Sequence, residues 1–244
     1  MAGNGLKPRC RCCIIATMKL LLWDFDGTLG TRDGAWTNTL CAMVAAAGCD
    51  APSDAIRQRL RSGFFWHDWQ TPHCHVQTAE QWWAHLTPML ERAMLGAGVN
   101  DAIASRLAAE FRHEYLRPGP WWRLYDDTLA TLAALSARGW RHRILSNHVP
   151  EFETIAERLG LTPHIDRIFN SAVTGYEKPH PRSFELAMEG VPPGSTIWMI
   201  GDNPQADIAG AESVGIPAIL VRTEHPQAKY SCATLDRLAD IIEA

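Results

Sequence analysis

Two aspartates, Asp24 and Asp26, directly follow the apolar run Leu20–Trp23 and lead into Gly27 and Thr28. A nearly continuous apolar run predicts a strand that is buried on both faces, as in the centre of a parallel sheet. Side chains alternate along an extended strand, so carboxylates two residues apart point the same way. One could serve as a nucleophile and the other as an acid/base. Taken alone, the pattern also fits exposed aspartates that begin a turn.

A second apolar run, Ile197–Ile200, also ends in carboxylates: Asp202 follows it, and Asp207 lies one turn into a helix expected from Pro204. Carboxylates that converge from two strand ends repel one another unless a cation neutralises them. Because the ligand set contains only oxygen, it favours Mg²⁺ over zinc. A helix cap and a favourable first-turn charge would explain Asp202 or Asp207 singly, but not their pairing with the first two aspartates.

Two further polar residues follow expected strand ends or turns. Ser146 comes after an expected strand at 140–145 and offers a hydroxyl to a phosphoryl oxygen, or it caps the next helix. Lys178 lies in the turn segment Gly175–Pro181 and is one of only four lysines in the chain. Its compact ammonium suits charge neutralisation beside a nucleophile, although for a single lysine a solvated loop position is the better interpretation.

In chain order, these pieces closely resemble the four motifs of the haloacid dehalogenase (HAD) superfamily, in its phosphatase branch. The segment Asp24–Leu29 resembles the first motif, and Ser146 the second. Lys178 resembles the third motif, and Gly201–Pro204 with Asp207 the fourth. Family members that remove halide from carbon lack a carboxylate at the position of Asp26. The resemblance therefore disfavours dehalogenation.

The resemblance implies two-step phosphoryl transfer with four catalytic residues. Asp24 would attack phosphorus to give an aspartyl-phosphate, while Asp26 would protonate the leaving alkoxide and later take a proton from water. Ser146 and Lys178 would stabilise the transferring oxygens, together with the substrate-binding groups. The substrate-binding groups would be Asn147 and the backbone N–H groups of Gly27 and Thr28.

The same resemblance implies a Mg²⁺ cofactor. Its ligands would be the Asp24 carboxylate, the Asp26 backbone carbonyl and Asp202, with Asp207 orienting a metal-bound water or Lys178. The substrate would be a small phosphorylated metabolite of undetermined identity. The alternatives are a phosphomutase that uses the same intermediate, and a non-catalytic ligand-binding module that has kept the HAD-like fold.

The distribution of expected helices and strands predicts an α/β fold, a Rossmann-like doubly wound parallel sheet core with a helical cap. Residues 18–32 and 121–244 would form the core, and 33–120 the cap, which such an insertion places over the phosphate site. Residues 1–17 are expected to be a poorly ordered extension. In the cap, the segment Trp66–Trp69 would face the substrate or form a buried helical turn.

Composition limits the partners. The chain has 244 residues and a net charge of −4, which gives no general affinity for nucleic acid or anionic membranes. Its longest apolar stretch is too short to span a bilayer. We therefore expect a cytoplasmic enzyme; the sequence does not indicate its oligomeric state.

Overall fold

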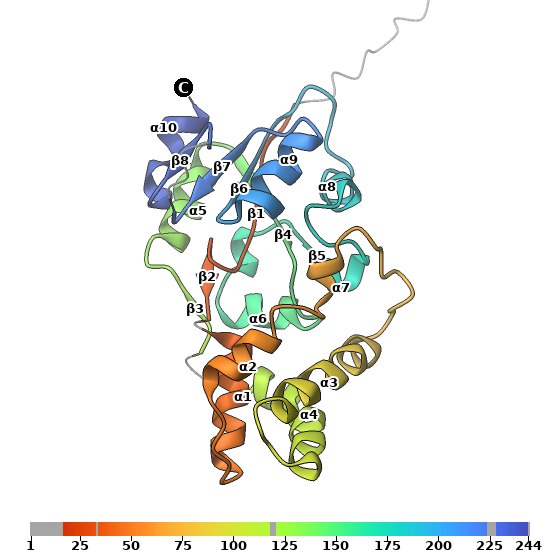
Figure 1. Cartoon of the computed structure of the whole chain (residues 1–244). Coiled ribbons are helices and arrows are strands. Elements are labelled where there is room, and N and C mark those ends of the chain that lie inside the picture. Colours follow the sequence, from red (N-terminus) through yellow and green to blue (C-terminus); the bar gives the residue numbers. More distant parts are fainter. Residues whose placement is uncertain (1–16, 33, 118–120, 224–227, 244) are drawn as a thin grey trace, which may run out of the picture.

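A computed structural model describes residues 17–32, 34–117, 121–223 and 228–243, so the expected extension at 1–17 lies almost wholly outside the described residues. A six-stranded sheet with the order β5-β4-β1-β6-β7-β8 forms the centre of the upper part of the molecule (Figure 1). Every strand pair in it is parallel. The strands are β1 (Lys19–Trp23), β4 (Trp140–Ser146), β5 (Arg167–Asn170), β6 (Thr196–Gly201), β7 (Ala218–Val221) and β8 (Ser231–Cys232).

Side-chain alternation along β1 divides the core into two apolar layers. Leu21 and Trp23 belong to one layer, and Leu20 and Leu22 to the other. The first layer is covered by α5 (Thr128–Ala137), α6 (Phe152–Arg158) and α10 (Leu238–Ile242), and the second by α8 (Pro181–Ala187), η3 (Pro204–Ala209) and α9 (Gly210–Ser213). Helices on both faces confirm the expected α/β, doubly wound architecture.

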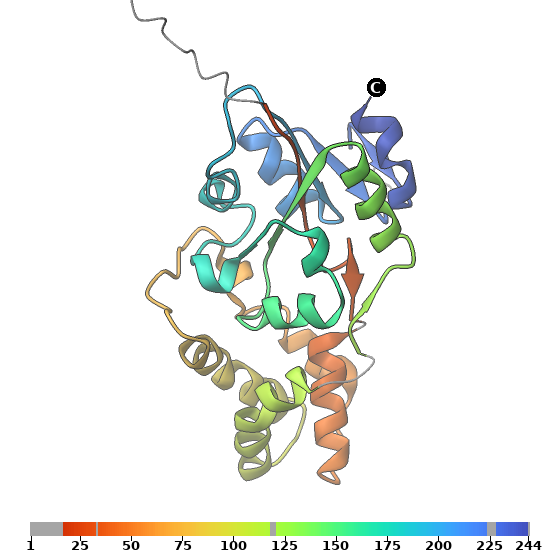
Figure 2. The same ribbon diagram turned by 180° about the vertical axis from the view of Figure 1, so that it is seen from behind.

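A helical unit, which we define as α1 to α4 with the turn η1, lies below the sheet in Figure 1, and Figure 2 shows the same arrangement from behind. Its elements are α1 (Ala35–Ala46), α2 (Ser53–Arg59), η1 (Phe65–Asp68), α3 (Ala79–Leu95) and α4 (Asp101–Leu116). Trp36, Trp82, Trp83, Phe111 and Tyr115 pack against one another in its interior. Most of the tryptophans of this unit therefore fill a small core.

Two chain crossings join the helical unit to the sheet. The strands β2 (Gly30–Thr31) and β3 (Arg123–Leu124) pair antiparallel there. Polar contacts also cross between the two parts: His73 Nε2 lies 3.0 Å from Glu177 Oε1 with both side chains buried, and Arg112 Nη2 lies 2.7 Å from Glu151 Oε1. The crossings and these contacts fix the helical unit against the carboxyl ends of the strands.

Three details of the fold differ from, or add to, the sequence expectation. A single helix was expected at 204–214, but residues 204–209 form a π-type helix before α9, a wider winding that recurs at functional sites. The strand β8 was not expected, because two residues at a sheet edge carry no periodicity. The short helix α7 (Ser171–Thr174), capped by Asn170, was likewise not anticipated, for it completes only one turn. The remaining short elements are the turns η2 (Thr162–His164) and η4 (Leu235–Arg237).

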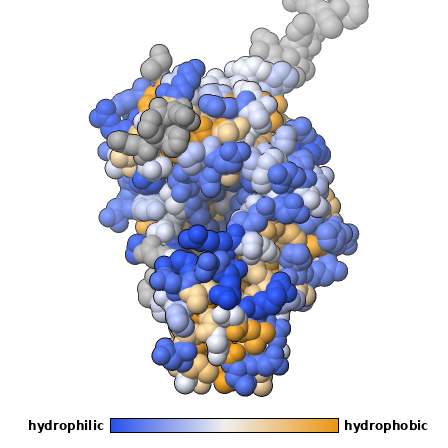
Figure 3. Space-filling model, in the orientation of Figure 1, coloured by the Kyte–Doolittle hydropathy of each residue, from blue (hydrophilic) through white to orange (hydrophobic). Residues whose placement is uncertain are grey.

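The surface is mostly hydrophilic on the face shown in Figure 3, with hydrophobic atoms gathered towards the lower end of the helical unit. Among the described residues, no helix combines the length and the apolar character that crossing a bilayer requires.

A buried histidine supports the strand that precedes the first aspartate. The indole Nε1 of Trp23 donates to His142 Nδ1 at 3.0 Å, and Ser136 Oγ lies 3.1 Å from His142 Nε2. Because Nδ1 accepts a hydrogen bond, the ring is neutral and carries its proton on Nε2. Burial lowers the pKa of His142 from 6.5 to about 4.

This pKa predicts a loss of stability in acid. Because the folded pKa lies below the unfolded value of 6.5, the unfolded chain binds the proton more tightly. The contribution is complete above about pH 6.5 and falls, by up to about 3 kcal/mol, as the pH drops towards 4. His142→Asn keeps an acceptor for Trp23 but does not titrate. Urea unfolding at pH 7 and pH 4.5 should show a smaller pH-dependent loss in this variant; equal losses in both proteins would contradict the assignment.

Candidate functional site

Four sequence motifs meet at the carboxyl edge of the sheet. Asp24 directly follows the central strand β1, and its backbone N–H donates to Ile200 O on β6 at 2.9 Å. On the other side of β1, Ser146 ends β4 and its hydroxyl donates to Asp24 Oδ1 at 3.1 Å. The ammonium of Lys178 lies 2.7 Å from the same Asp24 oxygen. Three strand ends and one loop thus meet at Asp24, and Ser146 and Lys178 contact its carboxylate.

Asp207 is the second partner of Lys178. Its Oδ1 lies 2.6 Å from the Lys178 ammonium, and its Oδ2 accepts from the backbone N–H of Asn203 at 3.0 Å. Burial opposes the positive charge of Lys178, but Asp207 and Asp24 more than offset it and raise the pKa of the ammonium above its usual value. Burial also raises the pKa of Asp207, yet the close ammonium favours its ionised form, and we take the ion pair as the resting state.

Asp24, Asp202 and Asp207 form a cluster of acidic groups suited to a cation. Each contributes one ligand oxygen, and these oxygens lie within 4.8 Å of one another. Burial raises the pKa of Asp202 to about 6, with a smaller upward contribution from the repulsion by Asp24. Carboxylates held this close, with a single lysine to balance them, have the charge and the oxygen-only donors that a hard divalent cation such as Mg²⁺ requires.

Two glycines permit this close approach. Gly27 has φ +81°, and a Cβ atom there would clash with Asp202 Oδ2. A Cβ atom on Gly201 would clash with the carboxylate of Asp207. Glycine at position 27 lets the turn after β1 touch the carboxylate that follows β6, and glycine at position 201 lets the end of β6 touch the carboxylate of the helix that follows it.

Asp26 faces the open side of the cluster. Although 49% of its side chain is exposed, it lies between the helical unit and the strand ends, where desolvation raises its pKa to about 8, with further upward contributions from Asp24 and Asp202. A carboxyl group with a raised pKa holds its proton near neutral pH. The side chain of Asp26 is thus suited to donate a proton into the space above Asp24.

His148, which the sequence reasoning did not select, lies next to Asp26. Its Nε2 is 3.5 Å from Asp26 Oδ2, and burial lowers the pKa of the ring to about 3. The only available signal was its position two residues after Ser146, since a histidine at a strand end has many ordinary uses.

The expected substrate-binding groups have hydrogen-bond partners within the protein. Both polar atoms of the Asn147 side chain bond the backbone of Lys178, as its Nδ2 donates to the carbonyl at 2.9 Å and its Oδ1 accepts from the N–H at 2.7 Å. The N–H of Gly27 donates to Gly30 O, and that of Thr28 donates to Phe25 O, within the turn after β1. Asn147 therefore holds the loop that carries Lys178, and the two amides stabilise the turn.

A cavity of about 500 Å³ opens above the carboxylates. Its floor contains Asp24, Asp26, Lys178, Asp202 and Asp207. Its opposite wall comes from the helical unit, through the side chains of Trp36, Trp66, His67, Trp69 and Tyr115. The segment Trp66–Trp69 was expected to be either a substrate-facing loop or a buried helical turn. Most of it belongs to η1, one turn of 3-10 helix, but the segment lines the cavity and is not buried. Contact with substrate stays a prediction.

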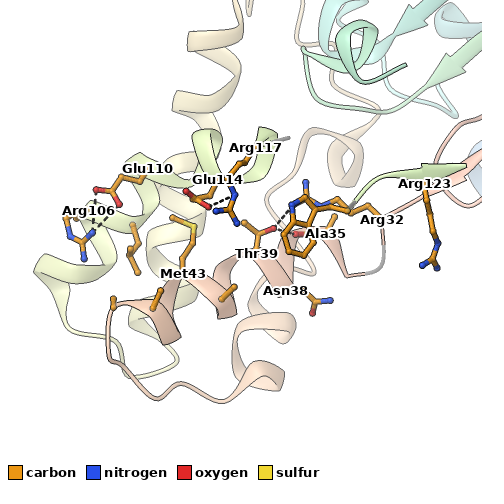
Figure 4. Close-up of a pocket in the computed structure, with 15 residues that line it drawn as sticks. Arg32, Ala35, Asn38, Thr39, Met43, Arg106, Glu110, Glu114, Arg117 and Arg123 are labelled. Carbon is orange, nitrogen blue, oxygen red and sulfur yellow. Dashed lines mark hydrogen bonds and ion pairs between the residues drawn. The ribbon is translucent and has the colours of Figure 1, made fainter. Parts of the chain in front are cut away.

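A larger cavity, of about 610 Å³, lies between α1 and α4 on the outer side of the helical unit (Figure 4). Its arginines are engaged by local partners: Arg106 pairs with Glu110, Arg117 with Glu114, and Arg32 donates to Thr39. None of the four clustered aspartates lines it. Size alone does not identify a reactive site, and it is the smaller cavity that contains the clustered carboxylates and Lys178.

Comparison with known proteins agrees with this geometry. The family model for haloacid dehalogenase-like hydrolases matches residues 18–215, which include all four motifs. The chain belongs to this family. Over 213 residues it is 30% identical to the human haloacid dehalogenase-like hydrolase domain-containing protein 3, covering 84% of this chain and 82% of that protein.

A relative named for its activity and a solved structure extend the comparison. The chain is 30% identical over 234 residues to a phosphoserine phosphatase of Thermus thermophilus, covering 86% of this chain and 93% of that protein. The HAD hydrolase YfnB of Bacillus subtilis, whose structure was solved with bound magnesium, superimposes with a TM-score of 0.72 at 20% identity, covering 94% of this chain and 100% of that one. The similarity to YfnB concerns the fold.

A side chain at Gly27 would clash with Asp202, which predicts a defect in metal binding. Gly27→Ala should push the Asp202 carboxylate away from Asp24 and weaken Mg²⁺ binding at least about tenfold, as disturbed ligand support does in metal sites. Isothermal titration calorimetry would measure the affinity. Gly215→Ala is the matched control, because Gly215 also has a positive φ of +78° but nothing lies within 4 Å of an added Cβ. Equal affinities in the two variants would contradict the steric explanation.

Proposed function

We propose that this hydrolase is a Mg²⁺-dependent phosphatase that cleaves a small phosphorylated metabolite through an aspartyl-phosphate on Asp24. The observation that carries the proposal is the shared contact of Ser146 and Lys178 with one oxygen of Asp24. Both groups donate to Oδ1, which holds the carboxylate in one orientation and leaves Oδ2 as the attacking atom. The hydrolysis of phosphoric monoesters agrees with the family and with the phosphatases among its relatives.

In the first step, Asp24 attacks phosphorus while Asp26 gives its proton to the leaving oxygen. The raised pKa of Asp26 keeps the proton available at neutral pH. In the second step, the Asp26 carboxylate takes a proton from the water that attacks the phosphorus of the aspartyl-phosphate. The two carboxyl groups thus divide the roles of nucleophile and acid/base, with Lys178 and Ser146 balancing the charge on the transferring oxygens.

The residues that would hold Mg²⁺ are Asp24, the Asp26 backbone carbonyl and Asp202, with Asp207 fixing Lys178 beside them. When bound, the cation would neutralise the carboxylates and polarise the phosphoryl group, which allows an anionic nucleophile to approach an anionic substrate.

We further propose that residues 33–120 act as a cap on a core of residues 18–32 and 121–244. The aromatic wall above Asp24 and the buried contact between His73 and Glu177 support this division. Closing such a cap excludes bulk water from the phosphoryl group and strengthens its electrostatic contacts.

Asp24→Asn tests the nucleophile. The variant should fold like the wild type and lose at least about 10⁴-fold in turnover, because an amide cannot form the phosphoryl ester. Phosphate release from p-nitrophenyl phosphate with Mg²⁺ measures the rate, and acid-quenched peptides should show one added phosphoryl group on Asp24 in the wild type only. Asp54→Asn, on an exposed side chain of α2, is the control and should behave as wild type. Near-normal turnover of the Asp24→Asn variant would refute the proposal; transfer of phosphate to a second hydroxyl without release would indicate a phosphomutase.

A further inference from the structure

The cavity wall contributed by the helical unit is aromatic. Among its described residues only His67 can become positively charged, and burial lowers the pKa of this ring, which favours its neutral form. Trp36, Trp66 and Trp69 are partly exposed there, whereas Trp82 and Trp83 are buried in the interior of the unit. The exposed rings are held in place from behind. Trp36 stacks on Tyr115 at 4.5 Å between ring centroids, and Trp66 stacks on Phe64 at 4.3 Å.

The basic side chains near the cavity already have partners within the protein. The only lysine or arginine among its described lining residues is Lys178, which is paired with Asp24 and Asp207. Arg32 lies behind the wall, where it donates to Tyr115 O and Thr39 Oγ1 and packs over the Tyr115 ring. Within the described part of the chain, no cation is therefore placed to receive a second anionic group, and no carboxylate of the wall is placed to receive an ammonium.

We infer that the substrate is a phosphomonoester whose leaving group bears a flat aromatic ring and no further charge. The ring would stack on Trp66 and Trp69 while the phosphoryl group sits over Asp24, and rigid aromatic walls favour such a fit at low entropic cost. The inference rests on the proposed phosphatase function. It separates this chain from enzymes whose leaving group is zwitterionic, such as the seryl group that the name of its Thermus relative specifies.

A pair of synthetic substrates tests the charge rule while leaving the acidity of the departing alcohol almost unchanged. 2-Phenylethyl phosphate should have a kcat/KM at least about tenfold above that of its para-carboxylate derivative. Trp66→Ala and Trp69→Ala should each lower the kcat/KM ratio of 2-phenylethyl phosphate to methyl phosphate several-fold, mainly through KM. Trp121→Ala is the matched control, because Trp121 is 47% exposed and lines the outer cavity, so the ratio should not change.

The outcomes are distinguishable. Hydrolysis of p-nitrophenyl phosphate together with an equal or greater rate for the carboxylate derivative would overturn the substrate class alone. Absence of phosphate release from every compound in the presence of Mg²⁺ would overturn the proposed function, and the substrate class with it.

A different observation concerns His148, whose side chain is buried and aimed at Asp26. The N–H of Val149 donates to His148 Nδ1 at 2.9 Å, so the ring proton is on Nε2. That Nε2 has no hydrogen-bond partner among the described residues and lies 3.5 Å from Asp26 Oδ2. Phe25, Phe152 and Trp122 surround the ring, with centroid distances of 5.7, 4.4 and 5.1 Å. A buried donor without a partner is costly, and a role in catalysis is one explanation for keeping it.

The geometry points to His148 as a positioning residue for Asp26. Its Nε2–H would close on Asp26 Oδ2 as the other carboxyl oxygen gives its proton to the leaving group. The hydrogen bond would then orient the carboxyl group and stabilise the carboxylate that the transfer leaves behind.

The test uses leaving groups that differ in their need for a proton. His148→Asn keeps an acceptor for Val149 but lacks the distal donor, whereas His148→Gln places an N–H near the position of Nε2. His148→Asn should lower the kcat/KM ratio of 2-phenylethyl phosphate to p-nitrophenyl phosphate about tenfold or more, because nitrophenolate leaves without protonation. His148→Gln should recover part of that ratio. Equal losses on both substrates, without recovery by Gln, would show that the ring only supports the fold.

Discussion

The close approach of carboxylates at one edge of the sheet is the constraint on which the rest of the structure depends. Asp24, Asp202 and Asp207 place oxygens within 4.8 Å of one another, and among the described residues only Lys178 forms ion pairs within this cluster. Like charges at such distances in a partly desolvated site repel strongly. The arrangement therefore has to be held by a framework whose stability comes from elsewhere, and a divalent cation bound among these oxygens would relieve the repulsion.

That framework is the central strand with its two neighbours. β1 pairs with β4 on one side and β6 on the other, and its residues alternate between two buried layers. A strand hydrogen-bonded on both edges and packed on both faces has little freedom to move, so Asp24 inherits a fixed position at its end. The loop of Lys178 is fastened separately, through the Asn147 side chain, which ties it to the end of β4.

The helical unit contributes the part of the site that the sheet cannot supply. Its interior aromatic residues form a small rigid core, and the tryptophans that remain partly exposed face the carboxylates across the cavity. His73 and Glu177 form a buried contact between the helical unit and the sheet, and Glu177 directly precedes Lys178 in the sequence. Breaking a buried polar contact leaves its donor and acceptor unsatisfied, which is costly. This contact thus links the position of the helical unit to the loop that carries the ammonium.

The sequence by itself determined the parallel sheet, the order of the motifs and the identity of the clustered groups. Apolar runs that end in polar residues, such as Leu20–Trp23 before Asp24, are local signals, and the carboxyl ends of parallel strands must share an edge. The sequence did not predict short elements such as β8 and the π-type winding at 204–209, because neither has enough residues to show a hydrophobic period.

Only the tertiary structure decided which contacts the individual side chains make. The sequence could not show that the Asn147 side chain bonds the Lys178 backbone, or that His148, which was not selected, lies against Asp26. The tertiary structure also shows which tryptophans fill the helical unit and which face the cavity. Composition and spacing cannot make these distinctions, because hydrogen-bond partners and exposure depend on residues that are distant in the chain and become neighbours only when it folds.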